Sequence, residues 1–384
     1  MVSRADTSRL AEWWRTIDRL MLAAVLFLML CGVLLSFAAS PAVADRIGVD
    51  TFHFIKRHAA FLAPAAMLFV GVSILSPKQV RRASFVLFAI SILLMLATLF
   101  VGAEVKGSRR WIVIAGFSLQ PSEFMKPAFV VITAWLFAEN SRRPDIPGNL
   151  FAIILFAIVA ALLMAQPDFG QTMLVGIVWG ALFFLAGMPW LWIGGLGALA
   201  VTGLGAAYTF FPHVAGRIDR FLSGEGDNYQ VETGREAIIN GGWLGQGPGE
   251  GTVKNIIPDS HADFPFAVAA EEFGIIACIL LVALFAFIVL RGMNHALREK
   301  DPYVRLAVSG LVTLFAIQSM INMMVNLQLM PAKGMTLPFI SYGGSSLISM
   351  AICMGFVLAL TRKRPDKLGS LPYGFTMRAW RPAE

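Results

Sequence analysis

The stretch Leu20–Ala39, LMLAAVLFLMLCGVLLSFAA, contains no charged side chain and is long enough to cross a membrane as one helix. The hydrocarbon core of a bilayer is about 30 Å thick, which a helix of about 20 residues spans. Further apolar segments of this kind follow, near residues 58–75, 83–102, 119–138, 150–165, 171–187, 190–211, 264–290, 304–325 and 342–361. The sequence therefore predicts an all-α polytopic membrane protein with about ten transmembrane helices.

The composition of the whole chain excludes other classes of protein. Of 384 residues, 57% are hydrophobic and 14% are charged, whereas about 25% are charged in a soluble globular protein. A soluble domain needs a polar surface and a disordered chain is poor in apolar residues, so neither class fits. We expect one integral membrane domain over 1–384, with cytoplasmic tails at 1–19 and 362–384. A long outer loop at 212–263 contains an amphipathic segment, Val231–Ile239.

The first apolar segment has a rival interpretation as a secretory signal. Basic residues precede it, and Ala42-Val43-Ala44 follows it as a signal-peptidase site would. The apolar run is long for the core of a signal peptide, so we interpret it as a retained span.

The distribution of Lys and Arg predicts the orientation of the chain. Placing both termini in the cytoplasm puts 19 of the 31 basic residues on the cytoplasmic side, as the positive-inside rule requires. Basic residues on the outer side gather in three loops, which contain Lys106, Arg109 and Arg110, then Lys254, then Lys333. The cytoplasmic excess of basic residues thus reflects membrane topology, so we expect no nucleic-acid partner. The basic residues kept on the outer side indicate an anionic ligand there.

Two charged residues fall inside the fourth apolar segment. Glu123 and Lys126 are three residues apart, so both lie on one face of a helix. Charge within a span is costly and marks a candidate site. The pair either neutralises itself and locks the helix packing, or lines a polar cavity.

The segment Pro258-Asp-Ser-His-Ala-Asp-Phe264 places titratable groups at the start of the eighth span. The helix dipole would stabilise the anion of Asp263, while the apolar residues after it would desolvate it. Such a carboxylate can take a proton from a hydroxyl, or it can simply cap the helix. His261 and Glu271 lie nearby in sequence, but no ligand spacing for a structural metal is present.

The outer loops contain further candidate groups. The Gly-rich stretch 241–251 either forms turns or brings backbone N–H groups close to a phosphate or sugar. Trp111 is either a stacking surface for a sugar or an interfacial anchor. The candidates for contact with an anionic, partly lipidic substrate are Lys106, Arg109, Arg110, Trp111, Lys254, Lys333 and Ser341.

Five motifs in order make the chain resemble the SEDS family (shape, elongation, division and sporulation). They are Lys106-Gly-Ser-Arg-Arg-Trp111, Gln120-Pro-Ser-Glu-Phe-Met-Lys126, Gln166-Pro-Asp-Phe-Gly170, Pro258–Phe264 with Glu271-Glu272, and Pro331–Ser346. The resemblance covers nearly the whole chain and is greater to the division member than to the elongation member. One departure is Pro265, where the family usually has a branched aliphatic residue, next to the expected start of the eighth span.

The resemblance implies ten spans and a peptidoglycan glycosyltransferase that polymerises lipid II on the periplasmic face of the bacterial inner membrane, at the division septum. It implies a class B penicillin-binding protein and other divisome membrane proteins as partners. It also implies that Asp263 is the essential acidic residue. Lys333 and Trp111 match positions implicated in function.

The resulting mechanistic hypothesis is an inverting glycosyl transfer with Asp263 as base and undecaprenyl pyrophosphate as leaving group. Basic side chains would neutralise that group, and a divalent cation, Mg²⁺ or Mn²⁺, could share this task. The alternatives are a lipid II flippase and a scaffold that only recruits the crosslinking enzyme.

Overall fold

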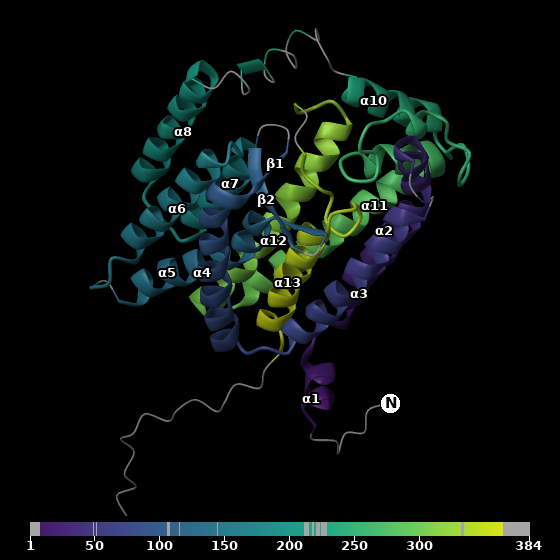
Figure 1. Ribbon diagram of the computed structural model, residues 1–384. Helices are drawn as coiled ribbons and strands as arrows, with labels where there is room; N and C mark the ends of the chain where they lie inside the picture. The colour runs from purple at the N-terminus through teal and green to yellow at the C-terminus, as the bar shows by residue number, and fades with distance from the viewer. Residues whose placement is uncertain are drawn as a thin grey trace, which may run out of the picture.

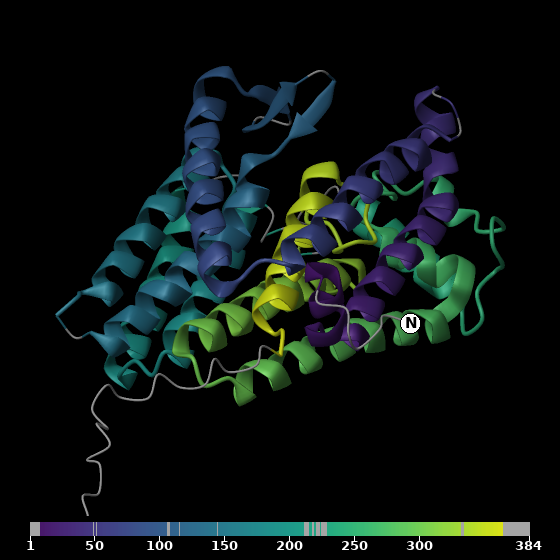
Figure 2. The same cartoon turned by 90° about the horizontal axis from the view of Figure 1, so that it is seen from below.

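The computed structural model describes residues 8–48, 50, 52–105, 108–114, 116–143, 145–210, 215–216, 219, 223, 229–331 and 334–363. These residues form a bundle of long helices (Figure 1; Figure 2). The helices are α1 (Arg9–Thr16), α2 (Arg19–Ile47), α3 (His53–Ser73), α4 (Pro77–Val101), α5 (Pro121–Arg142), α6 (Gly148–Ala165), α7 (Phe169–Leu185), α8 (Trp190–Phe210), α10 (Tyr229–Gly241), η1 (Val253–Asn255), α11 (Pro265–Arg298), α12 (Pro302–Asn326) and α13 (Gly344–Leu360).

Each apolar segment predicted from the sequence is a helix in the structure. Among the described helices, α2, α3, α4, α6, α8, α11 and α12 are long and apolar enough to span a membrane. Helices α7 and α13 are apolar but have 17 residues each, and α5 carries the charged pair. The protein is therefore a multi-pass membrane protein built from helices.

Helices α5 and α12 form the buried centre of the bundle. Helix α12 packs against α5, α7, α11 and α13, and α5 packs also against α4 and α6. Asp301 caps α12 by accepting hydrogen bonds from the backbone N–H groups of Tyr303 and Val304, and Pro302 occupies the first turn. Polar side chains of α5 and α12 are thus enclosed by other helices rather than by lipid.

The predicted loop between the third and fourth spans is a small antiparallel sheet, which the all-α prediction missed. Strands β1 (Ala103–Val105), β2 (Ser108–Ile114) and β3 (Phe117–Leu119) pair in that order. In the register, Trp111 lies opposite Ala103 and Ile112 lies opposite Leu119. The run of β-branched and aromatic residues in β2 favours a strand, and this signal is local and short.

The first apolar segment is packed as part of the bundle. Helix α2 continues through residues 42–44, the segment that resembles a processing site, and it packs against α3 and α11. Met21, Val25 and Leu28 of α2 are fully buried. This packing fits the interpretation of the segment as a span.

The amphipathic segment predicted in the long outer loop is also present, as helix α10. It packs against α11 and η1, and Thr233 and Ala237 are buried on that side. The start of α11 is therefore covered by the loop that precedes it.

Candidate functional site

Asp263 lies just before α11, and its backbone is held by α12. The helix begins at Pro265, with Phe264 as N-cap and no side-chain capping bond. The backbone oxygen of Asp263 accepts hydrogen bonds from Nδ2 of Asn322 at 3.0 Å and from Nδ2 of Asn326 at 3.1 Å. Because Pro265 takes the first helical position, Asp263 does not act as the helix cap.

The carboxylate of Asp263 faces the segment that follows Lys333. A Cβ placed on Gly334 would lie 3.6 Å from Oδ2 of Asp263. Asn322 also donates to the backbone oxygen of Met335 at 2.7 Å. The fold thus brings together a carboxylate and a loop that are far apart in the sequence. Lys333 itself lies outside the described residues.

His261 and Ser341 make contacts that stabilise this corner. The ring of His261 packs 4.4 Å from that of Phe54 and 5.3 Å from that of Tyr342, centroid to centroid. The backbone N–H of Tyr342 donates to the oxygen of His261 at 2.9 Å. Ser341 is buried, and its Oγ accepts from the N–H of Leu337 at 2.7 Å. Ser341 therefore closes the turn between residues 337 and 341.

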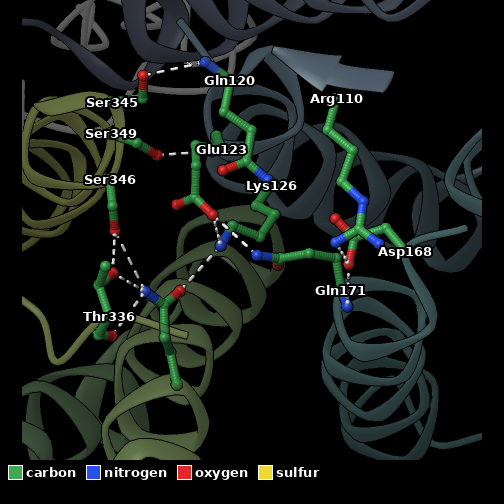
Figure 3. Close-up of polar contacts among 11 residues, drawn as sticks. Arg110, Gln120, Glu123, Lys126, Asp168, Gln171, Thr336, Ser345, Ser346 and Ser349 are labelled. Atoms are coloured by element: carbon green, nitrogen blue, oxygen red, sulfur yellow. Dashed lines mark hydrogen bonds and ion pairs between the residues drawn. The ribbon is translucent and has the colours of Figure 1, made fainter. Parts of the chain in front are cut away.

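The predicted pair of Glu123 and Lys126 is present and buried (Figure 3). Nζ of Lys126 lies 2.9 Å from Oε1 of Glu123 and also donates to Oε1 of Gln318 at 2.9 Å. Nε2 of Gln171 donates to the same oxygen of Glu123 at 2.9 Å. The pair therefore joins α5 to α7 and α12, as expected of a packing lock.

The same network extends to α13 and to the loop beside Asp263. Ser349 donates to the backbone oxygen of Glu123 at 2.6 Å. Nε2 of Gln318 donates to the backbone oxygen of Thr336 at 3.3 Å, and the hydroxyls of Thr336 and Ser346 are 2.6 Å apart (Figure 3). Residue 336 lies two positions from Gly334, so the buried charge pair is connected to the loop that borders the carboxylate.

Arg110 is engaged by the protein. Its Nε donates to the backbone oxygen of Gln166 at 3.0 Å, and Nη1 lies 3.5 Å from Oδ1 of Asp168. Its Nη2 donates to Ser108 at 3.0 Å and to the backbone oxygen of Pro167. Burial raises the pKa of Asp168, and the nearby Arg110 opposes that rise. Arg110 thus holds β2 to the connection between α6 and α7.

Arg109 is the more exposed of the two described arginines in this segment. Arg109 is about half exposed and forms an ion pair of 3.3 Å with Glu104 across the β1–β2 hairpin. The side chain of Trp111 is half-buried on β2. Lys106 lies outside the described residues.

Lys254 is buried and forms an ion pair with Glu272. The ammonium of Lys254 is therefore paired with a carboxylate of its own chain. The carboxylate of Glu271 accepts from Nδ2 of Asn240 at 3.0 Å and from the backbone N–H groups of Val253 and Lys254 at 2.8 Å each. Both glutamates therefore hold the segment between Asn240 and Lys254 against α11.

The Gly-rich stretch packs its backbone directly on α11. A Cβ on Gly245, which has φ +82°, would lie 2.2 Å from the backbone oxygen of Glu272. Gly274 has φ +80° and interrupts α11 at this contact. Both positions need glycine because the backbone of the Gly-rich stretch touches the backbone of α11 there, which leaves no room for a side chain.

Within the described residues, no group of three or more His, Cys, Asp or Glu side chains is arranged to hold a metal ion.

The family model described as "Cell cycle protein", for FtsW, RodA and SpoVE, matches residues 18–365. The chain belongs to the FtsW/RodA/SpoVE family.

Relatives in this family match over nearly their whole length. The "Probable peptidoglycan glycosyltransferase FtsW" of Caulobacter vibrioides is 48% identical over 376 residues, covering 97% of this chain and 96% of that protein. The protein of the same name from Trichlorobacter lovleyi is 32% identical, covering 92% of this chain and 94% of that protein.

Solved structures of the family have the same fold. A chain from "Structural coordination of polymerization and crosslinking by a peptidoglycan synthase complex" is 27% identical, with a TM-score of 0.76, covering 90% of this chain and 97% of that one. The rod shape determining protein RodA of Thermus thermophilus is 25% identical, with a TM-score of 0.67, covering 92% and 99%.

The sequence patterns did not identify Gln318 and Gln171 as partners of the buried charge pair in this member of the FtsW/RodA/SpoVE family. A signal was present for the first, because Gln318, Asn322 and Asn326 recur every four residues and so form a polar stripe on an apolar helix. Gln171 lies alone in an apolar segment, and no periodicity marks its contact with Glu123.

Proposed function

We propose that this protein is a peptidoglycan glycosyltransferase that polymerises lipid II on the periplasmic face during septal cell-wall synthesis. The names of its near full-length relatives support the reaction and the division role. The observation that carries the proposal is the placement of the Asp263 carboxylate against Gly334, next to the basic position 333. Glycosyl transfer from a pyrophosphate requires a base, and a carboxylate held in this place can supply it.

In the proposed reaction the 4-hydroxyl of an acceptor GlcNAc attacks C1 of a donor MurNAc. Asp263 takes the hydroxyl proton as the new O4–C1 bond forms. The bond from C1 to the pyrophosphate oxygen breaks, and undecaprenyl pyrophosphate leaves with the electron pair. Attack from the opposite face turns the α linkage into a β linkage, as in inverting glycosidases.

The leaving pyrophosphate carries negative charge that basic side chains would stabilise. Lys333 adjoins in sequence Gly334, the residue that lies against the carboxylate, and Arg109 is exposed on the β1–β2 hairpin, so these two are our candidates. Arg110 and Lys254 are engaged by protein carboxylates, and we assign them to holding the outer loops. Any Mg²⁺ or Mn²⁺ that shares this task would be held mainly by the pyrophosphate oxygens, and no step depends on one.

We further propose that the protein works in the inner membrane with a class B penicillin-binding protein, which crosslinks the new strand, and with other divisome membrane proteins. A similar solved chain comes from a complex whose name joins polymerization and crosslinking. This likeness supports a crosslinking partner of the same kind.

The test is polymer formation from lipid II already present on the outer side of vesicles that contain the full chain and its crosslinking partner. Asp263→Asn is expected to lower the rate by about 100- to 10,000-fold, the usual contribution of a general base. The matched control is Glu250→Gln, which neutralises an exposed carboxylate of the Gly-rich stretch and should retain activity. Co-purification of the partner with each variant checks the fold.

Three outcomes would contradict the proposal. Full glycan synthesis by Asp263→Asn would remove the base assignment. Absence of polymer with an intact complex and the wild-type chain would favour a lipid II flippase, because no transport is needed in this assay. Normal activity of all site variants that still bind the partner would favour a scaffold.

A further inference from the structure

A cavity of about 430 Å³ lies at the end of the bundle that carries α1 and the last turn of α13. It is lined by the link between α1 and α2, by the C-terminal end of α11 and by Thr361 and Lys363. This is the end that we predict to be cytoplasmic, opposite to the corner at Asp263. The cavity therefore lies outside the proposed catalytic site.

Basic side chains dominate the lining. Its fixed cations are Arg15, Arg19, Arg291, Arg298 and Lys363, and His295 adds a titratable nitrogen. Among the described residues that line the cavity, Asp18 is the one carboxylate. Such an excess of positive charge in a concave surface attracts an anion.

Both oxygens of Asp18 are used by the protein. Oδ1 accepts from the backbone N–H groups of Leu20 and Met21 at 3.1 Å each. Oδ2 lies 2.7 Å from Nε of Arg291 and 2.5 Å from Nε2 of His295. Although burial raises the pKa of Asp18, hydrogen bonds from His295 and Arg291 lower it below its usual value. Asp18 is thus paired in place with Arg291 and His295, and the described lining contains more cations than carboxylates.

Tertiary contacts hold the walls of the cavity. The backbone N–H of Lys363 donates to the oxygen of Thr16 at 3.0 Å, and Nε of Arg362 donates to the hydroxyl of Thr16 at 3.0 Å. The guanidinium of Arg19 lies 5.0 Å from the centre of the Trp14 ring. These contacts hold the segment after α13 and the start of α2 against α1.

The cavity lies at the level where two spans leave the membrane. The apolar span of α2 starts at Arg19, and the apolar run of α11 ends at Leu290. Headgroups of the inner leaflet occupy this level, and they are the main source of anionic phosphate there. Arginine guanidinium groups match the geometry of phosphate oxygens.

We propose that this cavity binds an anionic phosphate group, carried by a phospholipid headgroup or by a soluble phosphate. Its position at the ends of α2 and α11 favours the lipid. Binding there would fix α1, α2, α11 and the end of α13 relative to one another at the membrane surface. This inference does not depend on the glycosyltransferase activity.

The test measures binding to the purified full-length chain in detergent, by native mass spectrometry and by Trp fluorescence. The probes are dioctanoyl phosphatidylglycerol, zwitterionic dioctanoyl phosphatidylcholine and inorganic phosphate. The variants Arg298→Gln and Lys363→Gln remove exposed cations of the cavity. Arg82→Gln, at an exposed position of α4, is the matched control.

We expect phosphatidylglycerol to bind more tightly than phosphatidylcholine, and each cavity variant to weaken it by about fivefold. Arg82→Gln should leave the affinity unchanged, and all variants should keep the melting temperature of the wild type. Binding of inorganic phosphate as tight as that of phosphatidylglycerol, with the same sensitivity to the variants, would assign the site to soluble phosphate. Equal binding of both lipids, or equal loss in Arg82→Gln and the cavity variants, would overturn the proposal.

Discussion

Nδ2 of Asn322 lies 3.0 Å from the backbone oxygen of Asp263, so α12 holds the residue that carries the proposed base. The same amide binds Met335, one residue beyond Gly334. One side chain in the centre of the bundle therefore fixes both halves of the candidate site.

Replacing Asn322 tests this positioning role. Asn322→Ala would free the Asp263 corner and the loop at Met335 to move, and a shift of about 1 Å at a reacting group costs on the order of 100-fold in rate. We expect kcat for polymerisation to fall by about 10- to 100-fold with little change in KM. Asn294→Ala, on an exposed face of α11, is the control. An unchanged kcat in Asn322→Ala would show that α12 does not position the base.

The buried pair of Glu123 and Lys126 predicts strong coupling between the two residues. Lys126→Met leaves the Glu123 carboxylate buried without its cation, which costs about 3–5 kcal/mol. The double variant Glu123→Gln/Lys126→Met removes both charges and should regain most of this free energy of unfolding. Thermal and denaturant unfolding in detergent, over a double-mutant cycle, measures the coupling. Additive losses would contradict the interaction.

Lys254 offers a choice between a loop-holding role and substrate contact. Lys254→Met strands the buried Glu272 carboxylate and should lower both stability and activity. If Lys254 only holds the loop, the double variant Lys254→Met/Glu272→Gln regains stability and activity. Its polymerisation rate should then lie within about threefold of that of Glu272→Gln alone. A double variant that is stable but still inactive would instead indicate that Lys254 contacts the pyrophosphate of the substrate. Polymerisation rates and melting temperatures of the three variants decide between these roles.

The contacts of Asp18 predict a loss of stability in acid. Its pKa in the folded chain lies below the ordinary value of 3.8, so the folded state holds this proton less tightly than the unfolded state. The stability that Asp18 contributes is therefore fully present above about pH 4 and is lost as the pH falls further.

Asp18→Asn should accordingly flatten the decline of the melting temperature between about pH 5 and about pH 3. The exposed Asp145→Asn, in the α5–α6 connection, is the control and should leave the slope unchanged. A steeper decline in Asp18→Asn than in the wild type would contradict the sign of this effect.

Local patterns in the sequence were enough to predict the helices and the membrane class. A run of apolar residues must be helical in lipid because its backbone groups can find partners only within the segment. The spacing of Glu123 and Lys126 likewise predicted their contact, since three residues nearly complete one helical turn. The short sheet at 103–119 was missed because the hairpin signal was brief.

Local patterns could not predict which side chains from distant segments of the sequence contact one another. The sequence placed Lys254 and Arg110 among candidate substrate contacts, yet the folded chain pairs them with Glu272 and Asp168. Charge alone does not tell whether a cation meets a substrate or a carboxylate of its own chain. The helix packing chooses between them, because a buried polar group must find a partner in the place where the fold leaves it.

The meeting of Asp263 with Gly334 depends on the same packing. Hydropathy predicts that spans exist, but it carries no information on which spans are neighbours. Helix α12 brings residues 263 and 334 together through Asn322, because a buried amide must find its hydrogen-bond partners within the folded chain.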